Sequence, residues 1–410
     1  MSVDAREALL RMLAAALERV GGREAVQRHL SAHPIRGPVH VVAIGKAADA
    51  MARGAELALG EDLARGLVIT KHGHADQPHR PGCFEILESD HPVPGQATLR
   101  SGRAMLDFIA ATPPEDRLLF LISGGASSLV EVLPNGLGLP ELQRLSRWLL
   151  ASGFDIDAMN RVRQAVSLIK GGRLLGFLDG RPTSCLLISD VPGDDPAVIG
   201  SGPLVPRPDD VLPPDLPDWI RAWVERAGDR QRTVGVLPEL AVVARLEDAK
   251  QAAADAARAQ GFEVTVHPGL IDGEPEVVAD RAVAELTRAA PGVQIWGGET
   301  TPRLPDEPGR GGRNQHLALA AAVALEGRHD AWLLAAGTDG TDGPTEDAGA
   351  LVDGGTVDRG RLEGLDPQDC LRRADAGRFL EASGDLLRTG PTGTNVMDLV
   401  IGLKLEGPRG

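Results

Sequence analysis

Glycine-rich loops that carry charged or hydroxyl side chains follow short apolar runs at several places in the chain. The segment Gly45-Lys46-Ala47-Ala48 stands after the apolar run Val39–Ile44, where a helix is expected to begin. A lysine at a helix start lies beside backbone N–H groups that lack helical partners, and both features attract anions. The Walker A pattern GxxxxGK[ST] is not met, because position 40 is His and position 47 is Ala. Lys46 is therefore a candidate anion-binding residue, and an ordinary surface lysine is the alternative.

A second loop of small residues follows the apolar run Leu118–Ile122. It consists of Ser123, Gly124, Gly125, Ala126, Ser127 and Ser128. Small side chains let the backbone approach a phosphate or carboxylate closely, and the three hydroxyl groups add hydrogen-bond donors. An ordinary strand–helix turn needs only one glycine and one capping residue. We therefore expect this loop to bind a phosphate group or a substrate.

Carboxylates occupy a third loop, Ser189-Asp190-Val191-Pro192-Gly193-Asp194-Asp195, which also follows an apolar run. Mg²⁺ prefers oxygen ligands and keeps several of its waters, so a carboxylate at the end of a strand suits it. Asp190 is the candidate metal ligand. The alternative is an Asp-rich turn that is closed by its own side chains.

The second half of the chain adds four loops of the same kind. They are Gly297-Gly298-Glu299-Thr300-Thr301, Gly309–Gln315, Gly337–Pro344 and Thr389–Asn395. The second of them leads into a helix, which would present Arg313 and unpaired N–H groups to a ligand. Arginine suits two-point binding of carboxylate or phosphate, and a structural ion pair is the alternative for Arg313.

Between about residues 39 and 189, apolar runs of strand length alternate with helical stretches, which predicts βαβ units and a mainly parallel sheet. A second α/β series follows from about residue 247. With 410 residues, two domains are expected. A proline-rich connector, Pro203–Pro217, reads as an extended segment near their boundary. The expected strands are 39–44, 66–70, 84–87, 118–122, 185–189, 262–267, 293–296, 332–336 and 396–403. The expected helices are 47–59, 96–110, 140–150, 156–169, 247–260, 276–289 and 315–325.

The composition excludes several classes of protein. There are 58 acidic and 43 basic side chains, a formal charge of −15, which argues against nucleic-acid and anionic-membrane surfaces. The three cysteines, Cys83, Cys185 and Cys370, show no metal-binding spacing and predict a reducing compartment. Residues 1–16 are typical of an amphipathic helix and no long apolar span occurs, so we expect a cytoplasmic protein.

Taken in order, these motifs resemble the glycerate 2-kinase family with a MOFRL-type C-terminal domain, some members of which carry the name hydroxypyruvate reductase. The resemblance runs from about Ala43 to Leu403 and includes Ser89-Asp90-His91-Pro92-Val93-Pro94. It implies two α/β domains, the first a Rossmann-like three-layer parallel sheet at 1–235 and the second at 236–410. It also implies phosphorylation of D-glycerate to 2-phosphoglycerate by ATP with Mg²⁺ or Mn²⁺. The sequence leaves the oligomeric state open, a homodimer included.

The resemblance further implies roles for individual residues. Lys46 and Arg313 would be the catalytic cations, and Ser123–Ser128 would bind phosphate or glycerate. The nucleotide-binding residues would be Asp190, Gly298, Glu299, Asn314 and Asp339, with Asp190 also at the metal. Because these residues come from both domains, we expect the active site in the interdomain cleft.

The sequence departs from the family pattern at two positions and leaves two rival functions to weigh. His316 stands where Glu is usual, and Arg245 stands where Asn is common. The first rival, an NAD(P)H-dependent hydroxypyruvate reductase, calls for a dinucleotide fingerprint, but GxGxxG does not occur in the chain. The second, a non-catalytic sugar-acid or nucleotide-binding protein, does not account for Asp190 and Asp339.

Overall fold

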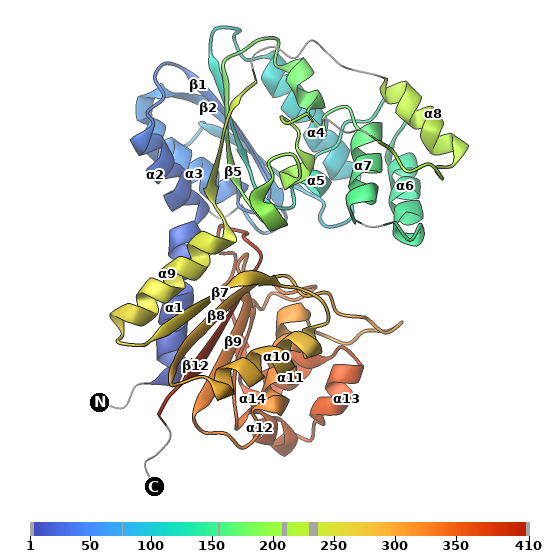
Figure 1. The fold of residues 1–410 in the computed structure, drawn as a ribbon. Helices are drawn as coiled ribbons and strands as arrows, with labels where there is room; N and C mark the ends of the chain where they lie inside the picture. Colours follow the sequence, from blue (N-terminus) through green and yellow to red (C-terminus); the bar gives the residue numbers. More distant parts are fainter. Residues whose placement is uncertain (1–3, 76, 155, 207–210, 229–236, 407–410) are drawn as a thin grey trace. The chain divides into compact units, whose positions relative to one another are not determined.

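The chain divides into two units, one of which is formed by segments from both ends of the sequence. The computed structural model describes residues 4–406 except 76, 155, 207–210 and 229–236 (Figure 1). The first unit is Gly21–Ala244, and the second joins Met1–Val20 to Arg245–Gly410. The predicted domain boundary between residues 235 and 236 lies outside the described residues. Helix α1 (Ala5–Val20) packs against α9 (Leu246–Ala259) in the second unit, although the sequence analysis assigns it to the first domain.

The sheet of the first unit consists, within the described residues, of six parallel strands. They are β1 (Val39–Ile44), β2 (Leu63–Lys71), β3 (Phe84–Ser89), β4 (Arg117–Ile122), β5 (Thr183–Ile188) and β6 (Glu239–Ala244). Their order is β3-β2-β1-β4-β5-β6, so strand addition reverses direction between β1 and β4. In open α/β sheets, ligands bind beyond the carboxyl ends of the strands at such a reversal. The Rossmann-like parallel sheet is confirmed, and its order points to the loops after β1 and β4.

Apolar sequence explains why β1 and β4 lie at the centre of this sheet. Every residue of β1 is buried, and only Arg117 of β4 is partly exposed. Parallel strands that are covered on both faces read as continuous apolar runs rather than as alternating patterns. The two strands pair in register, with Val41 opposite Leu119 and Ile44 opposite Ile122. Their carboxyl ends therefore finish side by side.

Helices cover both faces of the first sheet and complete three layers (Figure 1). One face carries α3 (Ala48–Leu59), with α2 (Gly22–Ala32) packed against it. The other face carries α4 (Gln96–Ala110) and the short α5 (Ala126–Leu129), which pack on a core that includes Phe120.

Three further helices form an apolar cluster of their own in the first unit. They are α6 (Leu139–Ala151), α7 (Ile156–Val166) and α8 (Asp218–Ala227). Trp219 meets Trp148 and Trp223 edge to face, with ring centroids 6.2 and 4.5 Å apart. Because α8 and β6 belong to the first unit, the connector Pro203–Pro217 leads back into that unit and does not mark its end.

The second unit contains a mixed sheet of six strands within the described residues. They are β7 (Val264–Ile271), β8 (Gly292–Gly298), β9 (Ala331–Gly337), β10 (Gly349–Asp353), β11 (Leu386–Leu387) and β12 (Asp398–Lys404). The order is β11-β10-β9-β12-β8-β7, with β12 antiparallel to both of its neighbours. The mainly parallel arrangement predicted from the first series of strands therefore does not extend to this unit. The insertion of β12 brings its first residue, Asp398, beside the carboxyl ends of β8 and β9.

Helices also cover both faces of the second sheet. One face carries α1 and α9, and the other carries α10 (Pro275–Arg288), α11 (Arg313–Ala324) and α14 (Ala376–Ser383) (Figure 1). Two shorter helices, α12 (Thr356–Leu362) and α13 (Pro367–Arg372), pack beside α14. No helix among the described residues is long and apolar enough to cross a membrane.

A histidine whose side chain is almost inaccessible to solvent links the segment between β2 and β3 to α3. His79 Nε2 lies 2.7 Å from Asp49 Oδ1, and His79 Nδ1 lies 3.1 Å from Glu56 Oε2. Burial alone would lower the pKa of His79, but the hydrogen bonds and charges of Asp49 and Glu56 outweigh burial and raise it. The protonated imidazole therefore stabilises the first unit.

We expect the stability that His79 contributes to depend on pH. Because its folded pKa is raised, the contribution is complete below the unfolded value near 6.5 and is lost as the pH rises through the folded value. Urea unfolding of wild type and His79→Gln should therefore differ most at acidic pH and converge at alkaline pH. His72→Gln, an exposed change in the same segment, is the control and should show a smaller, flatter difference. A constant difference for His79→Gln at every pH would contradict this expectation.

Candidate active site

The loops after β1 and β4 are joined directly through their backbones. The Lys46 N–H donates to Gly124 O at 2.9 Å, and the Ala47 N–H donates to Ser123 Oγ at 3.0 Å. A Cβ at Gly45 would lie only 2.1 Å from Ser123 Oγ, and Gly45 has a φ of +133°, so no other residue fits there. The N–H groups of Lys46 and Ala47 are thus used within the protein, contrary to the expectation that they would face an anion. The cation at this edge is the Lys46 side chain.

Gly125 forms the contact between Lys46 and a third loop. Its φ is +82°, and a Cβ at this position would lie 3.2 Å from Lys46 Cγ and 3.1 Å from the Cδ2 and Nε2 atoms of His91. His91 comes from the segment after β3, within the Ser89–Pro94 motif of the family resemblance. The absence of a side chain at Gly125 lets the lysine and the histidine approach each other across the loop.

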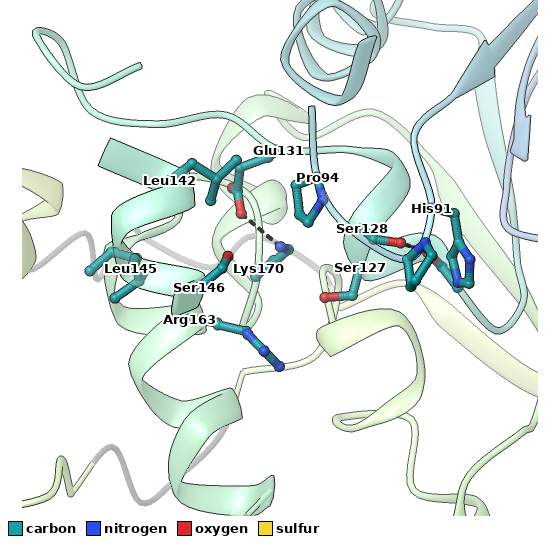
Figure 2. A pocket seen from close by; sticks show the side chains of 13 residues that line it. His91, Pro94, Ser127, Ser128, Glu131, Leu142, Leu145, Ser146, Arg163 and Lys170 are labelled. Carbon is teal, nitrogen blue, oxygen red and sulfur yellow. Dashed lines mark hydrogen bonds and ion pairs between the residues drawn. The ribbon is translucent and has the colours of Figure 1, made fainter. Parts of the chain in front are cut away.

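A cavity of about 230 Å³ opens beside this contact (Figure 2). Of the six loop residues predicted to bind phosphate or substrate, Gly125, Ser127 and Ser128 line it. Ser123 is fully buried, and its hydroxyl holds the Ala47 N–H. The carbonyl group of Gly124 accepts the hydrogen bond from the Lys46 N–H. Ser123, Gly124 and the buried Ala126 do not line the cavity, and their role as ligand-binding residues stays a prediction.

Three charged residues that the sequence analysis did not single out also line the cavity. Glu131 and Lys170 form a buried ion pair, with Lys170 Nζ 2.6 Å from Glu131 Oε2. Ser167 Oγ donates to the other carboxylate oxygen at 2.6 Å. The third residue, Arg163, extends from α7 toward the cavity (Figure 2). In the sequence, Lys170 could have been noticed as a charged residue directly after the apolar pair Leu168-Ile169.

Asp190 lies just beyond β5, the strand next to β4, and is partly buried. It therefore shares the carboxyl edge of the sheet with Lys46 and the Ser123–Ser128 loop. No three His, Cys, Asp or Glu side chains gather as a metal-binding set in the part of the chain that the structure describes. The metal role of Asp190 stays a prediction.

In the second unit, Arg313 at the start of α11 is held by two carboxylates. Its Nε and Nη2 donate to Asp398 Oδ2 and Oδ1 at 2.5 and 2.9 Å, and its Nη1 pairs with Glu299. Burial alone would lower the pKa of Arg313, but the charges of Asp398 and Glu299 outweigh burial and raise it. The side chain of Asp398 is almost fully buried, whereas that of Glu299 is about half exposed. The ion pair that the sequence left as an alternative is therefore present.

The first turn of α11 is capped by Asp342, which sequence reasoning did not assign. Asp342 Oδ1 accepts from the Asn314 N–H at 3.1 Å, and Oδ2 accepts from the Gln315 N–H at 2.8 Å. Burial raises the pKa of Asp342 to about 7 against the lowering effect of these two N–H groups, and the charge of Asp398 adds to the rise. The expectation that these N–H groups would be presented to a ligand is wrong, because a carboxylate of the same unit already holds them.

The other predicted nucleotide-binding residues lie along the same edge of the second sheet. Gly298 is the last residue of β8, and Asp339 follows β9. Asp339 is buried, and its Oδ1 accepts from the Thr341 N–H at 2.9 Å. A Cβ at Gly337 would lie 3.4 Å from Asp339 Oδ1 and 3.5 Å from Asp398 Oδ1, so these carboxylates flank one glycine. Their contact with a nucleotide stays a prediction.

Both departures from the family pattern have local partners. His316 Nε2 lies 2.7 Å from Glu276 Oε1, which links α11 to α10. The Arg245 N–H donates to Asp248 Oδ2 at 3.2 Å at the start of α9. Each residue therefore fits its helix without disturbing Arg313.

Two family models match the chain. "Domain of unknown function (DUF4147)" covers residues 8–213, and "MOFRL family" covers 292–398. The D-glycerate 2-kinase of Thermotoga maritima is 38% identical over 382 residues, which are 89% of this chain and 90% of that protein. A crystal structure of glycerate kinase from Thermotoga maritima matches with a TM-score of 0.84 at 35% identity, covering 98% of this chain and 99% of that one.

The chain belongs to the glycerate 2-kinase family. A protein of Agrobacterium vitis that is provisionally named hydroxypyruvate reductase is also 38% identical, over 416 residues that cover 97% of this chain and 94% of that protein. Both names that the sequence resemblance suggested thus occur among relatives of similar identity. Within the family, this chain has Lys46, Gly125 and His91 in one contact and Arg313 in a separate carboxylate cluster.

The contact at Gly125 makes a specific substitution informative. We expect Gly125→Ala to destabilise the protein by about 1–2 kcal/mol, because φ of +82° is unfavourable for an L-residue. The new methyl group should also displace Lys46 or His91 and lower the turnover number about 10- to 100-fold, since small misplacements of catalytic groups have effects of that size.

Gly73→Ala is the matched control, because Gly73 has a φ of +77° but nothing within 4 Å of the added Cβ. Chemical unfolding and steady-state kinetics should show a similar loss of stability for both variants but a loss of turnover only for Gly125→Ala. Equal turnover in the two variants would show that the packing of Lys46 and His91 around Gly125 does not matter for activity.

Proposed function

We propose that this chain is a kinase that transfers the γ-phosphoryl group of ATP to the 2-hydroxyl group of D-glycerate. The observation that carries the proposal is its 38% identity to the D-glycerate 2-kinase of Thermotoga maritima over nine-tenths of both chains. The first sheet supports it with a cation and hydroxyl groups at the reversal of strand order. The rival reductase has the support of a relative's name, but the chain lacks the GxGxxG loop that binds a dinucleotide.

Lys46 is the first cation of the proposed reaction. Phosphoryl transfer is catalysed mainly by positioning the two substrates and stabilising the charge on the transferring group. Lys46 meets this requirement because its backbone is fixed to Gly124 and its side chain packs on Gly125, which lines the cavity. In our proposal the ammonium group binds the transferring phosphoryl group, and the cavity binds glycerate.

Arg313 is the second cation of the proposed reaction, and its two carboxylate partners, Asp398 and Glu299, have different roles. Asp398 is buried and engages two nitrogen atoms, so it fixes the plane of the guanidinium group. Glu299 is much more exposed, and exposed ion pairs contribute only about 0–1 kcal/mol. A phosphate group can replace Glu299 at Nη1 without breaking the buried pair. Lys46 and Arg313 lie in different units, and their action in one reaction remains part of the proposal.

The divalent ion of the proposed reaction is Mg²⁺, with Asp190 as a ligand. Mg²⁺ at kinase sites usually takes one or two carboxylates, with waters and substrate phosphates filling its other positions. One carboxylate at the sheet edge that carries Lys46 fits this chemistry without a larger set of protein ligands. When bound with ATP, the ion would neutralise part of the negative charge on the phosphates.

The proposal is tested by offering both pairs of substrates. With D-glycerate, ATP and Mg²⁺, we expect turnover and a product whose phosphorus NMR spectrum matches 2-phosphoglycerate. Excess EDTA should abolish this turnover, because Asp190 and the phosphates need the divalent ion. With hydroxypyruvate and NADH, the nicotinamide absorbance should stay constant. Steady oxidation of NADH without phosphorylation of glycerate would establish the reductase instead.

Two substitutions test the proposed cations. Lys46→Ala should lower the turnover number about 10²-fold or more, the usual effect of removing a preorganised charge-stabilising donor. Arg313→Lys should lower it nearly as much as Arg313→Ala, because lysine keeps the charge but loses the planar fork. Stability should distinguish the last two, since Arg313→Ala leaves the buried Asp398 unpaired, a loss of about 3–5 kcal/mol.

Lys71→Ala removes a positive charge at the end of β2 and serves as the control for Lys46→Ala. Its turnover number should stay within about twofold of wild type, because a charge outside the contact should add little once it is screened by solvent. If Lys46→Ala were as active as this control, Lys46 would be an ordinary surface lysine without a role in catalysis.

A further inference from the structure

The cavity beside Ser127 contains two cationic side chains whose charges are balanced differently. Lys170 is paired with Glu131 at 2.6 Å, and both side chains are almost fully buried. A pair of this kind is electrically neutral as a unit and already has its charged hydrogen bonds. Lys170 is therefore poorly suited to bind an anionic ligand without first losing Glu131.

Arg163 is in the opposite situation. Its Nη1 donates to Asn160 Oδ1 at 3.2 Å, and no carboxylate pairs with it among the side chains that the structure describes. Burial lowers the pKa of Arg163, and no charge among the described side chains offsets the effect. A partly buried guanidinium group without an anion lowers the stability of the fold, so its place in a cavity calls for another explanation.

We propose that Arg163 binds the carboxylate group of glycerate in this cavity and thereby selects a hydroxy acid over a neutral polyol. The proposal rests on the glycerate kinase function proposed above and names the group that recognises the acid. A guanidinium group can grip a carboxylate at two points, which gives orientation as well as affinity.

The dimensions and the lining of the cavity suit this ligand. About 230 Å³ is smaller than the roughly 300–1,000 Å³ of pockets for drug-sized ligands, so it suits a three-carbon acid better than a nucleotide. Ser201 Oγ donates to Ser127 Oγ at 2.8 Å, which leaves the Ser127 proton for an acceptor on the ligand. Arg163 and His91 lie on opposite sides of the cavity (Figure 2). A carboxylate at Arg163 would therefore direct the hydroxyl end of glycerate toward Gly125, against which Lys46 packs.

Steady-state kinetics on Arg163→Gln test the proposal. We expect the KM for D-glycerate to rise about 10²-fold, the scale of losing a charge-assisted hydrogen-bonded pair, with the KM for ATP within about twofold of wild type. Arg163→Lys should lie between wild type and Arg163→Gln, because it keeps one point of contact. Arg147→Gln, an exposed change on α6, is the matched control and should resemble wild type. A rise in the KM for ATP instead of glycerate would overturn the proposal in favour of a phosphate contact.

The preference for glycerate over glycerol should change only if Arg163 contacts the substrate, and not if Arg163 has a purely structural role. Glycerol has the hydroxyl groups of glycerate but no carboxylate. The ratio of kcat/KM for glycerate to that for glycerol should fall about 10²-fold in Arg163→Gln, because only the acid loses a partner. An unchanged ratio would overturn the proposal, whatever the absolute activities.

Binding without ATP separates this proposal from the proposed reaction. Calorimetric titration of D-glycerate should give binding to wild type, to Arg147→Gln and more weakly to Arg163→Lys, with loss of about 10²-fold in Arg163→Gln. Inorganic phosphate, titrated in the same way, should bind more weakly than glycerate to wild type. Arg163-dependent binding of glycerate without turnover would refute the kinase function and leave the carboxylate site standing. Equal affinity of wild type and Arg163→Gln for glycerate would refute the carboxylate site, even with full kinase activity.

Thermal unfolding guards against a variant that simply fails to fold. Removing an unpaired buried charge should leave the melting temperature of Arg163→Gln equal to or above that of wild type. Glycerate should raise the melting temperature of wild type but not of Arg163→Gln, since a ligand stabilises only the state that binds it. A lower melting temperature for Arg163→Gln without ligand, together with a normal shift on adding glycerate, would mark Arg163 as a structural residue and overturn the proposal.

Discussion

The close approach of the two loops after β1 and β4 is the constraint on which the candidate site depends. Gly45 lies so near Ser123 that a single added carbon would occupy the position of its hydroxyl group. That approach lets the Ser123 hydroxyl hold the Ala47 N–H, and it sets the Lys46 N–H against the Gly124 carbonyl. Lys46 is thereby fixed at the base of its side chain, where a lysine is otherwise free to reorient. The glycines thus fix the backbone of Lys46, and in our proposal the side chains bind the anion.

The sequence predicted the first sheet well because the signal there is local. Buried parallel strands are continuous apolar runs, and the expected strand 39–44 and helix 96–110 agree with β1 and α4. Prediction failed where the determinant was long-range. The antiparallel insertion of β12 is a matter of strand order, which no local pattern encodes, and β6 was missed because an edge strand with partly exposed residues lacks a continuous apolar run.

In the candidate site, too, the residues marked by a local sequence pattern could be predicted, whereas residues brought together only by folding could not. A glycine-rich loop after a strand marked Lys46, and a glycine-rich loop before a helix marked Arg313. Residue types and the ends of elements can be recognised in the sequence itself. The cavity residues Glu131, Lys170 and Arg163 come from the loop after α5, a turn and α7, and only folding brings them together. The assignment of N–H groups to ligands failed for a related reason. Whether a helix start is open to an anion depends on whether a distant carboxylate, such as Asp342, has already reached it.

The second unit contains two buried carboxylates whose mutual repulsion lowers its stability. Asp342 and Asp398 are both buried near one arginine, and burial with mutual repulsion raises the pKa of Asp342 to about 7. A carboxyl group whose folded pKa is raised from 3.8 favours the unfolded state increasingly as the pH rises between these values. The charge of Asp398 adds to this rise, so the two buried carboxylates repel each other beside Arg313. Replacing one carboxylate by an amide would remove that repulsion, so its presence is better explained by what it does to the arginine. Asp398 holds the guanidinium group of Arg313 at two nitrogen atoms, and the exposed Glu299 is the partner that an incoming phosphate displaces in our proposal.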